Sequence, residues 1–237
     1  MPYAQAHDHG ERPATWSPTL VAGGFVLASL AGFVNASLLS FYDVPVSHMS
    51  GAATRLGIDL GTGQSDELLR LAGILGSFFA GAVVSGCIIG RHRLLPGRRY
   101  GAVLLIESAS LALAGWLLAK GSAGSLGAAA FACGLQNAMA SSYYGLIIRT
   151  THMTGIVTDL GAMLGTLLRH RHGEPWKFAL LGAILGGFIL GAAASALVGA
   201  DAGINRLYLA AGFAAAIAVG HRLQHVRPPH PGAEDGR

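Results

Sequence analysis

The sequence has few charged residues and few aromatic ones, and this scarcity indicates its class. Charged residues make up only 12% of the 237 residues and aromatic residues 8%, whereas apolar residues make up 52%. Together with a mean hydropathy of +0.50, this composition argues against a water-soluble protein and indicates an integral membrane protein. The 35 glycines favour helices that pack closely in lipid, where small residues let two backbones approach.

Cysteines and catalytic motifs are also scarce. Cys87 and Cys133 both fall in apolar stretches, without a second Cys or a His at metal-ligand spacing, so we interpret them as small buried residues. There is no Gly-x-Ser-x-Gly, His-Glu-x-x-His or paired-carboxylate pattern, so we expect no enzyme and no cofactor. Two His-Met pairs, at 48–49 and 152–153, could offer soft ligands to copper. Adjacent side chains point apart, however, and we predict no metal site.

The net charge of +4 comes from basic residues scattered in small groups between apolar stretches, which we interpret as topology signals and not as a nucleic-acid-binding surface. Because residues 1–16 are polar and the apolar stretch after them is long, we expect no cleavable signal peptide. Six stretches approach the roughly 20 apolar residues that a bilayer core requires. These predicted transmembrane helices are residues 17–41, 69–90, 100–118, 124–148, 177–199 and 204–220.

Two further helix-like stretches, 47–61 and 151–168, each carry a charge, Arg55 and Asp159 respectively. If neither crosses the membrane, twelve of the 16 Lys and Arg residues lie on one side, and four lie on the other. Cytoplasmic loops are enriched in Lys and Arg. The distribution therefore predicts six spans with both termini in the cytoplasm.

The chain contains an internal repeat. In the first half, Gly-Phe-Val-Asn-Ala at 32–36 is followed by Ser-His-Met-Ser-Gly at 47–51 and Thr-Arg-Leu-Gly at 54–57. In the second half, Gly-Leu-Gln-Asn-Ala at 134–138 is followed by Thr-His-Met-Thr-Gly at 151–155 and Thr-Asp-Leu-Gly at 158–161. The next span also repeats, as Ile-Leu-Gly-Ser-Phe at 74–78 with Gly81 and Ile-Leu-Gly-Gly-Phe at 184–188 with Gly191.

Three spans per half is an odd number, so the second copy should be inverted relative to the first, as in many transporters. The sequence thus predicts an all-α membrane protein with six transmembrane helices in a 3+3 inverted repeat, plus two short helices after spans one and four. We expect a single membrane domain at 17–221, with repeats at 17–118 and 124–220. Its flanks would be a polar tail at 1–16 and a disordered tail at 222–237.

The paired [Ser/Thr]-His-Met-[Ser/Thr]-Gly motifs, each after a Gly-x-x-Asn-Ala span, resemble those of the YoaK-like bacterial inner-membrane proteins. The resemblance runs from about Leu20 to Val219. It implies a bacterial inner-membrane location and the predicted six-span fold. Members of that family are largely uncharacterised, although some are labelled small-molecule permeases. The resemblance therefore gives little information on activity and carries over no functional residues.

We expect Ser47 or Ser50, and Thr151 or Thr154, to cap the short helices. These helices are either re-entrant, with their N-termini meeting near the middle of the bilayer, or amphipathic helices at the membrane surface. The predicted substrate path or binding site comprises Ser47, His48, Ser50, Gly51, Thr54, Thr151, His152, Thr154, Gly155, Thr158, Asn35 and Asn137.

Charged residues within or near the spans are candidates for coupling or gating, and these are Glu107, Arg55 and Asp159. Arg55 and Asp159 are equivalent positions of opposite charge, so they either pair or are separately solvated. Glu107 either couples transport or forms a structural pair. The two histidines either carry protons or only hydrogen-bond the backbone, and the two asparagines either join helices or line the path.

The sequence therefore predicts a transporter or channel for an unidentified small solute, with the path between the two repeats. The alternatives are a membrane scaffold or assembly factor, or an intramembrane enzyme. Helix N-termini on the path would favour an anion or another solute with oxygen acceptors. Expected partners are the lipid bilayer and the solute, with no nucleic acid; a homo-oligomer is left open.

Overall fold

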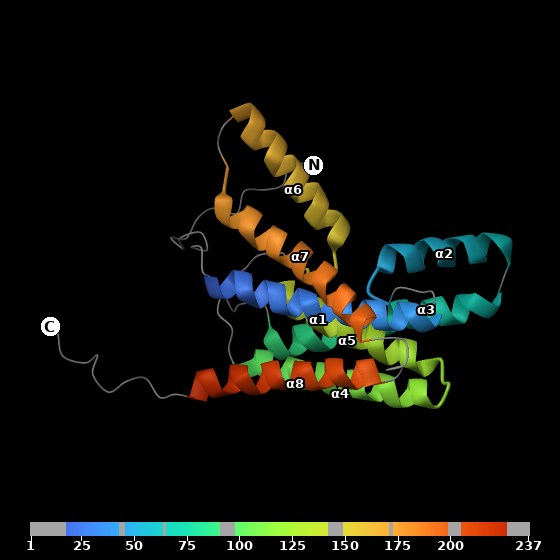
Figure 1. Ribbon diagram of the computed structural model, residues 1–237. Helices are drawn as coiled ribbons and strands as arrows, with labels where there is room; N and C mark the ends of the chain where they lie inside the picture. Colours follow the sequence, from blue (N-terminus) through green and yellow to red (C-terminus); the bar gives the residue numbers. More distant parts are fainter. Residues whose placement is uncertain are drawn as a thin grey trace.

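A computed structural model describes residues 18–42, 46–63, 65–90, 98–141, 149–170, 173–198 and 205–226, and these residues form eight helices and no strand (Figure 1). The predicted N-terminal tail and residues 227–237 of the predicted C-terminal tail lie outside this part, whereas residues 222–226 are helical. The helices are α1 (Pro18–Tyr42), α2 (Met49–Thr62), α3 (Ser65–Ile89), α4 (Arg98–Ala119), α5 (Gly124–Ser141), α6 (Met153–His170), α7 (Pro175–Leu197) and α8 (Asn205–Val226).

The prediction of six transmembrane helices is wrong. Among the described helices, only four are long and apolar enough to cross a membrane: Pro18–Tyr42, Glu67–Ile89, Arg99–Ala119 and Pro175–Leu197. The described part of α5 is short and consists largely of Gly, Ala and Ser, with Gln136 and Asn137 near its end, while residues 142–148 of that predicted span lie outside the described residues. In α8, the apolar stretch is limited to the residues between Arg206 and Arg222.

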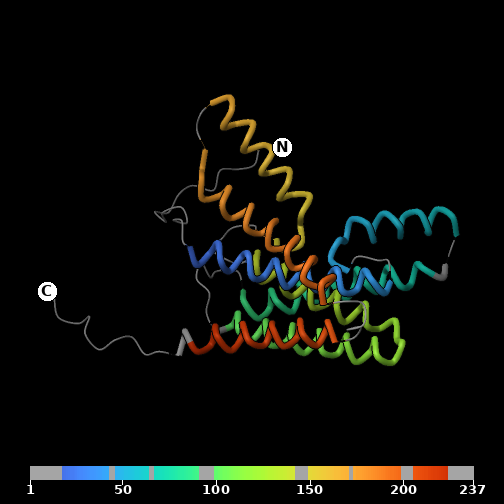
Figure 2. The backbone as a smooth tube through the Cα atoms, in the orientation of Figure 1, coloured from blue at the N-terminus to red at the C-terminus, as the bar shows by residue number. Residues whose placement is uncertain are grey.

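Six of the helices lie alongside one another as a bundle, and α2 and α6 project from it (Figures 1 and 2). The main pairs are α1 with α7, α3 with α5, and α4 with α8. The repeat relates α1 to α5 and α3 to α7, so the first two pairs are the same contact made twice with the copies exchanged. In Figure 1, α1 runs from left to right and its counterpart α5 from right to left.

Glycines set the distance between these paired helices. A Cβ atom on Gly191 of α7 would lie 1.9 Å from the carbonyl oxygen of Ser29 in α1. At the equivalent Gly81 of α3, it would lie 2.1 Å from the carbonyl oxygen of Phe131 in α5. Only a residue without Cβ allows such close approach of two backbones, so the equivalent glycines in the two halves hold equivalent helix crossings.

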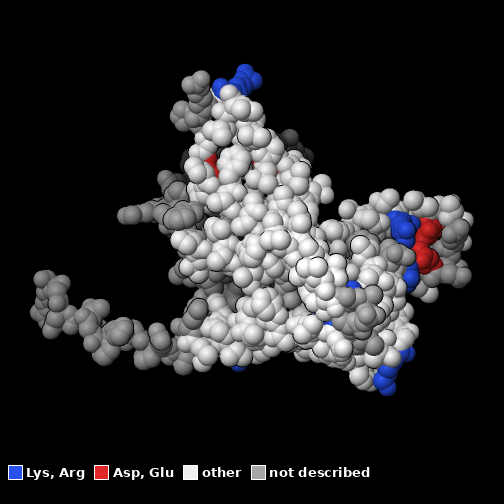
Figure 3. Space-filling view, viewed as in Figure 1, with Lys and Arg blue, Asp and Glu red and all other residues white. Residues whose placement is uncertain are grey.

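The surface fits a membrane environment. Figure 3 shows charged side chains at the hairpin of α2 and α3, at the end of α6 and at the lower edge, with a broad uncharged surface between them. Large apolar side chains are exposed on the bundle, including Phe79, Ile189, Leu209 and Phe213. Exposed apolar surface of this kind is unfavourable in water and compatible with contact with a lipid bilayer. Together with the four candidate spans, it suggests a membrane protein.

Candidate functional site

The first repeated motif, residues 47–51, forms a turn that we call the first elbow. It is tied back to the preceding helix, because the buried Ser47 hydroxyl donates to Asn35 Oδ1 of α1 over 2.8 Å. The next helix, α2, begins at Met49 with His48 as its N-cap, and no side chain caps it. The expectation that Ser47 or Ser50 caps this helix is therefore wrong: the Ser47 hydroxyl is already hydrogen-bonded to Asn35.

The second elbow, residues 151–155, is held more firmly by the equivalent asparagine. Asn137 Nδ2 of α5 donates to Thr151 Oγ1 over 2.5 Å. Its Oδ1 accepts from the Thr150 hydroxyl at 3.2 Å and from the Thr151 backbone N–H at 3.3 Å. Both asparagines therefore fix an elbow of their own copy. This role differs from the helix joining and path lining expected for them, although Asn137 also lines the cavity described next.

The two elbows meet at one cavity of about 700 Å³, which we call the elbow cavity. It lies beside Phe78 and Ala82, in the middle part of α3. The first elbow and α2 contribute Ser47, His48, Met49 and Ser50. The second elbow and α6 contribute Thr151, His152, Met153 and Thr154, and the remaining lining residues are Asn137, Ala138, Ser141 and Arg149.

The two histidines of the elbows have different surroundings. His48 lies against Phe188 of α7, with 5.9 Å between the ring centroids, and its burial lowers the pKa of the imidazole below the ordinary value of 6.5. His152 is exposed and its ring lies over Gly155, where a Cβ atom would be 2.5 Å from Nδ1. The copies are therefore equivalent in backbone position but not in side-chain conformation.

Each elbow leaves unpaired N–H groups at the start of a helix. Within the described residues, the backbone N–H groups of Met49 and Ser50 have no acceptor, and neither do those of Thr154 and Gly155. Such groups carry the positive end of the helix dipole. Of these four residues, Met49, Ser50 and Thr154 line the elbow cavity.

Several predicted site residues do not line this cavity. Thr54 and Thr158 donate to the backbone of their own helices, at Ser50 and Thr154 respectively, and Gly51 has open space around it. The others outside the lining are Asn35, Gly155, Glu107, Arg55 and Asp159.

The charged candidates are separate from one another. Arg55 and Asp159 are exposed, and the described side chains form no ion pair between these two residues, because α2 lies along α3 whereas α6 lies along α7. Glu107 in α4 is only 1% exposed, and its Oε2 has no hydrogen-bond partner within the described residues.

Sequence reasoning did not assign seven of the lining residues to the site: Met49, Phe78, Ala82, Ala138, Ser141, Arg149 and Met153. Phe78 belongs to the repeated Ile-Leu-Gly-x-Phe segment, so the repeat could have drawn attention to it, although only tertiary packing brings it to the elbows. Arg149 stands two residues before Thr151. Its charge predicts a topology signal, and the residue lines the cavity as well.

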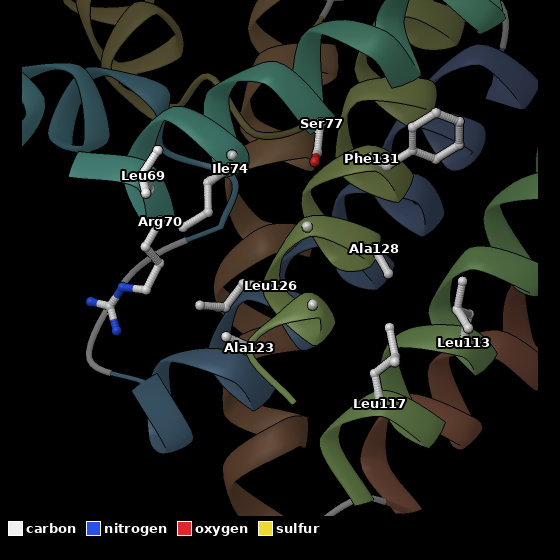
Figure 4. Close-up of a pocket in the computed structure, with 13 residues that line it drawn as sticks. Leu69, Arg70, Ile74, Ser77, Leu113, Leu117, Ala123, Leu126, Ala128 and Phe131 are labelled. Atoms are coloured by element: carbon white, nitrogen blue, oxygen red, sulfur yellow. The ribbon is translucent and has the colours of Figure 1, made fainter. Parts of the chain in front are cut away.

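A second cavity, of about 850 Å³, lies between α3, α4 and α5 (Figure 4). Its labelled side chains are mainly apolar, such as Leu113, Leu117 and Phe131, and the Arg70 guanidinium points away from them. Arg70 pairs with Glu67 at 2.7 Å. No residue of either elbow lines this cavity, so the elbow cavity is the better candidate site.

Comparison with known proteins yields one match. A family model described as "Protein of unknown function (DUF1275)" matches residues 23–220. No curated protein and no solved structure matches the chain. The resemblance to the YoaK-like proteins stays a prediction, because the matching family model does not carry that name.

Proposed function

We propose that this chain, which belongs to the DUF1275 family, is a membrane transporter or channel for a small solute that passes through the elbow cavity. Both repeated turns line the proposed route. We propose no catalytic role, because the hydroxyls of Ser47 and Thr151 are hydrogen-bonded to asparagines and not to a base that could activate them.

One observation carries this proposal: motifs about a hundred residues apart in the sequence line a single cavity beside the middle of a candidate span. In a membrane, irregular backbone at that depth is tolerated where it lines a cavity or is buried in protein. Transporters commonly place binding sites where two repeats meet and helices are interrupted. A scaffold would need no such polar cavity.

The proposed setting is the bacterial inner membrane, with both termini in the cytoplasm. The four candidate spans form an even number, which leaves both ends on the same side of the membrane. The segment 90–98, between the second and third of these spans, lies on that side as well and carries three arginines, and cytoplasmic loops are enriched in Lys and Arg. Reporter fusions at the two ends would contradict this orientation if they reported opposite compartments.

Solute flux into proteoliposomes tests the function. The exposed Cys87 would first be replaced by Ser, and the purified protein reconstituted into vesicles. Swelling of the vesicles in acetate, phosphate, glycerol or urea would then be followed by light scattering. We expect at least one solute to enter faster than in empty vesicles. Ser50→Cys and Thr154→Cys then place a thiol at each elbow, and a charged methanethiosulfonate should slow that entry in both variants.

The matched control is Thr62→Cys, at the far end of α2, which is exposed like Ser50 but outside the cavity. The reagent should leave its flux unchanged. Two results would contradict the proposal: no solute entering above the background of empty vesicles, or equal inhibition of Thr62→Cys and Ser50→Cys.

A further inference from the structure

The lining of the elbow cavity carries charge of one sign. Arg149 supplies a guanidinium, and no Asp or Glu is among the lining residues. Within the described residues, this guanidinium has no ion-pair or hydrogen-bond partner. Arg149 is exposed, so a ligand that enters the cavity can reach its guanidinium, and no carboxylate in the lining competes for it. The cavity therefore favours a ligand that brings negative charge.

The unpaired backbone N–H groups point to the same ligand class independently of Arg149. α2 has 14 residues and α6 has 18, so both are long enough to carry a helix dipole. Both begin at this cavity with free N–H groups, at Met49 and Ser50 and at Thr154. Helix N-termini stabilise anions and disfavour cations.

Five of the lining residues are apolar, and they indicate the rest of the ligand. Met49, Met153 and Phe78 lie in the lining with Ala82 and Ala138. Inorganic anions would leave these side chains without contacts, whereas an organic body would cover them. The volume of about 700 Å³ falls within the roughly 300–1,000 Å³ typical of small-molecule sites.

We propose that the elbow cavity binds a small organic carboxylate, with the carboxylate group at Arg149 and the helix N-termini and the apolar body against Met49, Met153 and Phe78. This inference rests on the proposed function, because it names the solute class of the same cavity. Arg149 can hold a carboxylate through two parallel hydrogen bonds, which a neutral amide cannot reproduce.

Binding to the purified protein in detergent tests the solute class without any flux measurement. Isothermal titration would compare two carboxylates, butyrate and phenylacetate, with their amides and with the amines butylammonium and phenethylammonium. We expect at least one carboxylate to bind more tightly than its own amide and amine. The inference is overturned if neither carboxylate binds, or if an amide or amine binds as tightly as the matching carboxylate.

Arg149→Gln should weaken carboxylate binding by about 10- to 100-fold, which corresponds to about 1.4–2.8 kcal/mol and is the loss expected for charge-assisted hydrogen bonding. Arg149→Lys keeps the charge and loses the two-bond geometry, so its affinity for the carboxylate should fall between those of the wild type and Arg149→Gln. The control is Arg169→Gln, an exposed arginine in the last turn of α6 and outside the cavity, which should bind like the wild type. Wild-type affinity in Arg149→Gln would refute the assigned carboxylate contact.

These results separate the two proposals. If a neutral amide binds and enters vesicles while the carboxylates do neither, the solute class is wrong and the transport proposal stands. If a carboxylate binds in an Arg149-dependent manner but no solute crosses the membrane, the solute class stands and the transport proposal is wrong.

Discussion

The close crossing of α1 and α7 makes Gly191→Ala a demanding test of the packing. The added Cβ atom would lie 1.9 Å from the Ser29 carbonyl oxygen, whereas real Cβ atoms essentially never come within 3.0 Å of another atom. The obstacle is backbone and cannot rotate away, so the helices must separate. Overpacking of this kind costs about 1–3 kcal/mol.

Gly182→Ala is the matched control, since it lies in the same helix with nothing within 4 Å of the added Cβ atom. Alanine is favoured over glycine inside a helix by about 0.8–1 kcal/mol, so this variant should be as stable as the wild type or more stable. Gly191→Ala gains the same propensity, so the free energy of unfolding should differ between the two variants by the overpacking cost alone, about 1–3 kcal/mol.

The repeat supplies a second pair. Gly81→Ala in α3 brings the Cβ atom to 2.1 Å from the Phe131 carbonyl oxygen, whereas Gly76→Ala in the same helix meets nothing within 4 Å. We expect the same difference as in α7. The assay is reversible unfolding in mixed micelles, as sodium dodecyl sulfate is increased, followed by far-ultraviolet circular dichroism. Equal stability of Gly191→Ala and Gly182→Ala would refute the close crossing.

Two further predictions concern buried polar groups. Asn137→Ala removes three hydrogen bonds, to Thr150 and Thr151, and Asn35→Ala removes one, to Ser47. At about 1 kcal/mol per bond, Asn137→Ala should destabilise the protein by about 2–3 kcal/mol and Asn35→Ala by about 1 kcal/mol. The unfolding assay measures both, and a larger loss in Asn35→Ala would contradict this account. Glu107→Gln should fold at least as stably as the wild type, because Oε2 has no partner within the described residues. If Glu107 couples transport to protons, the flux of this variant should also no longer depend on pH. A wild-type pH profile of vesicle uptake would exclude the coupling role.

The sequence predicts the helices of this fold better than their membrane topology. The apolar stretches at 17–41, 69–90, 100–118 and 177–199 correspond to α1, α3, α4 and α7, which are the four candidate spans. The sequence also predicts spans at 124–148 and 204–220, which overlap α5 and α8, because both stretches are rich in small apolar residues. Those small residues pack against other helices, so α5 is largely buried by protein, and they add little hydropathy of their own.

The site was predicted in part. The repeated motif identified the residues of the two elbows, and the structure brings both elbows to one cavity. The sequence could not show that Ser47 would bond to Asn35 in preference to capping α2, because two acceptable partners compete for one hydroxyl. Nor could it show the direction of α2 and α6, on which any pairing of Arg55 with Asp159 depends.

The glycine crossings also constrain how this protein is made. Gly81 meets its partner in α5, and α1 meets Gly191 of α7, so each close contact joins an early segment to one synthesised later. During translation α1, α3 and α4 leave the ribosome before their main partners, α7, α5 and α8 respectively, have been made. Nascent α1 must wait in the insertion machinery, or in lipid, until α7 follows. Assembly is therefore completed late, and truncation before α7 would leave the tightest interface of α1 unmade.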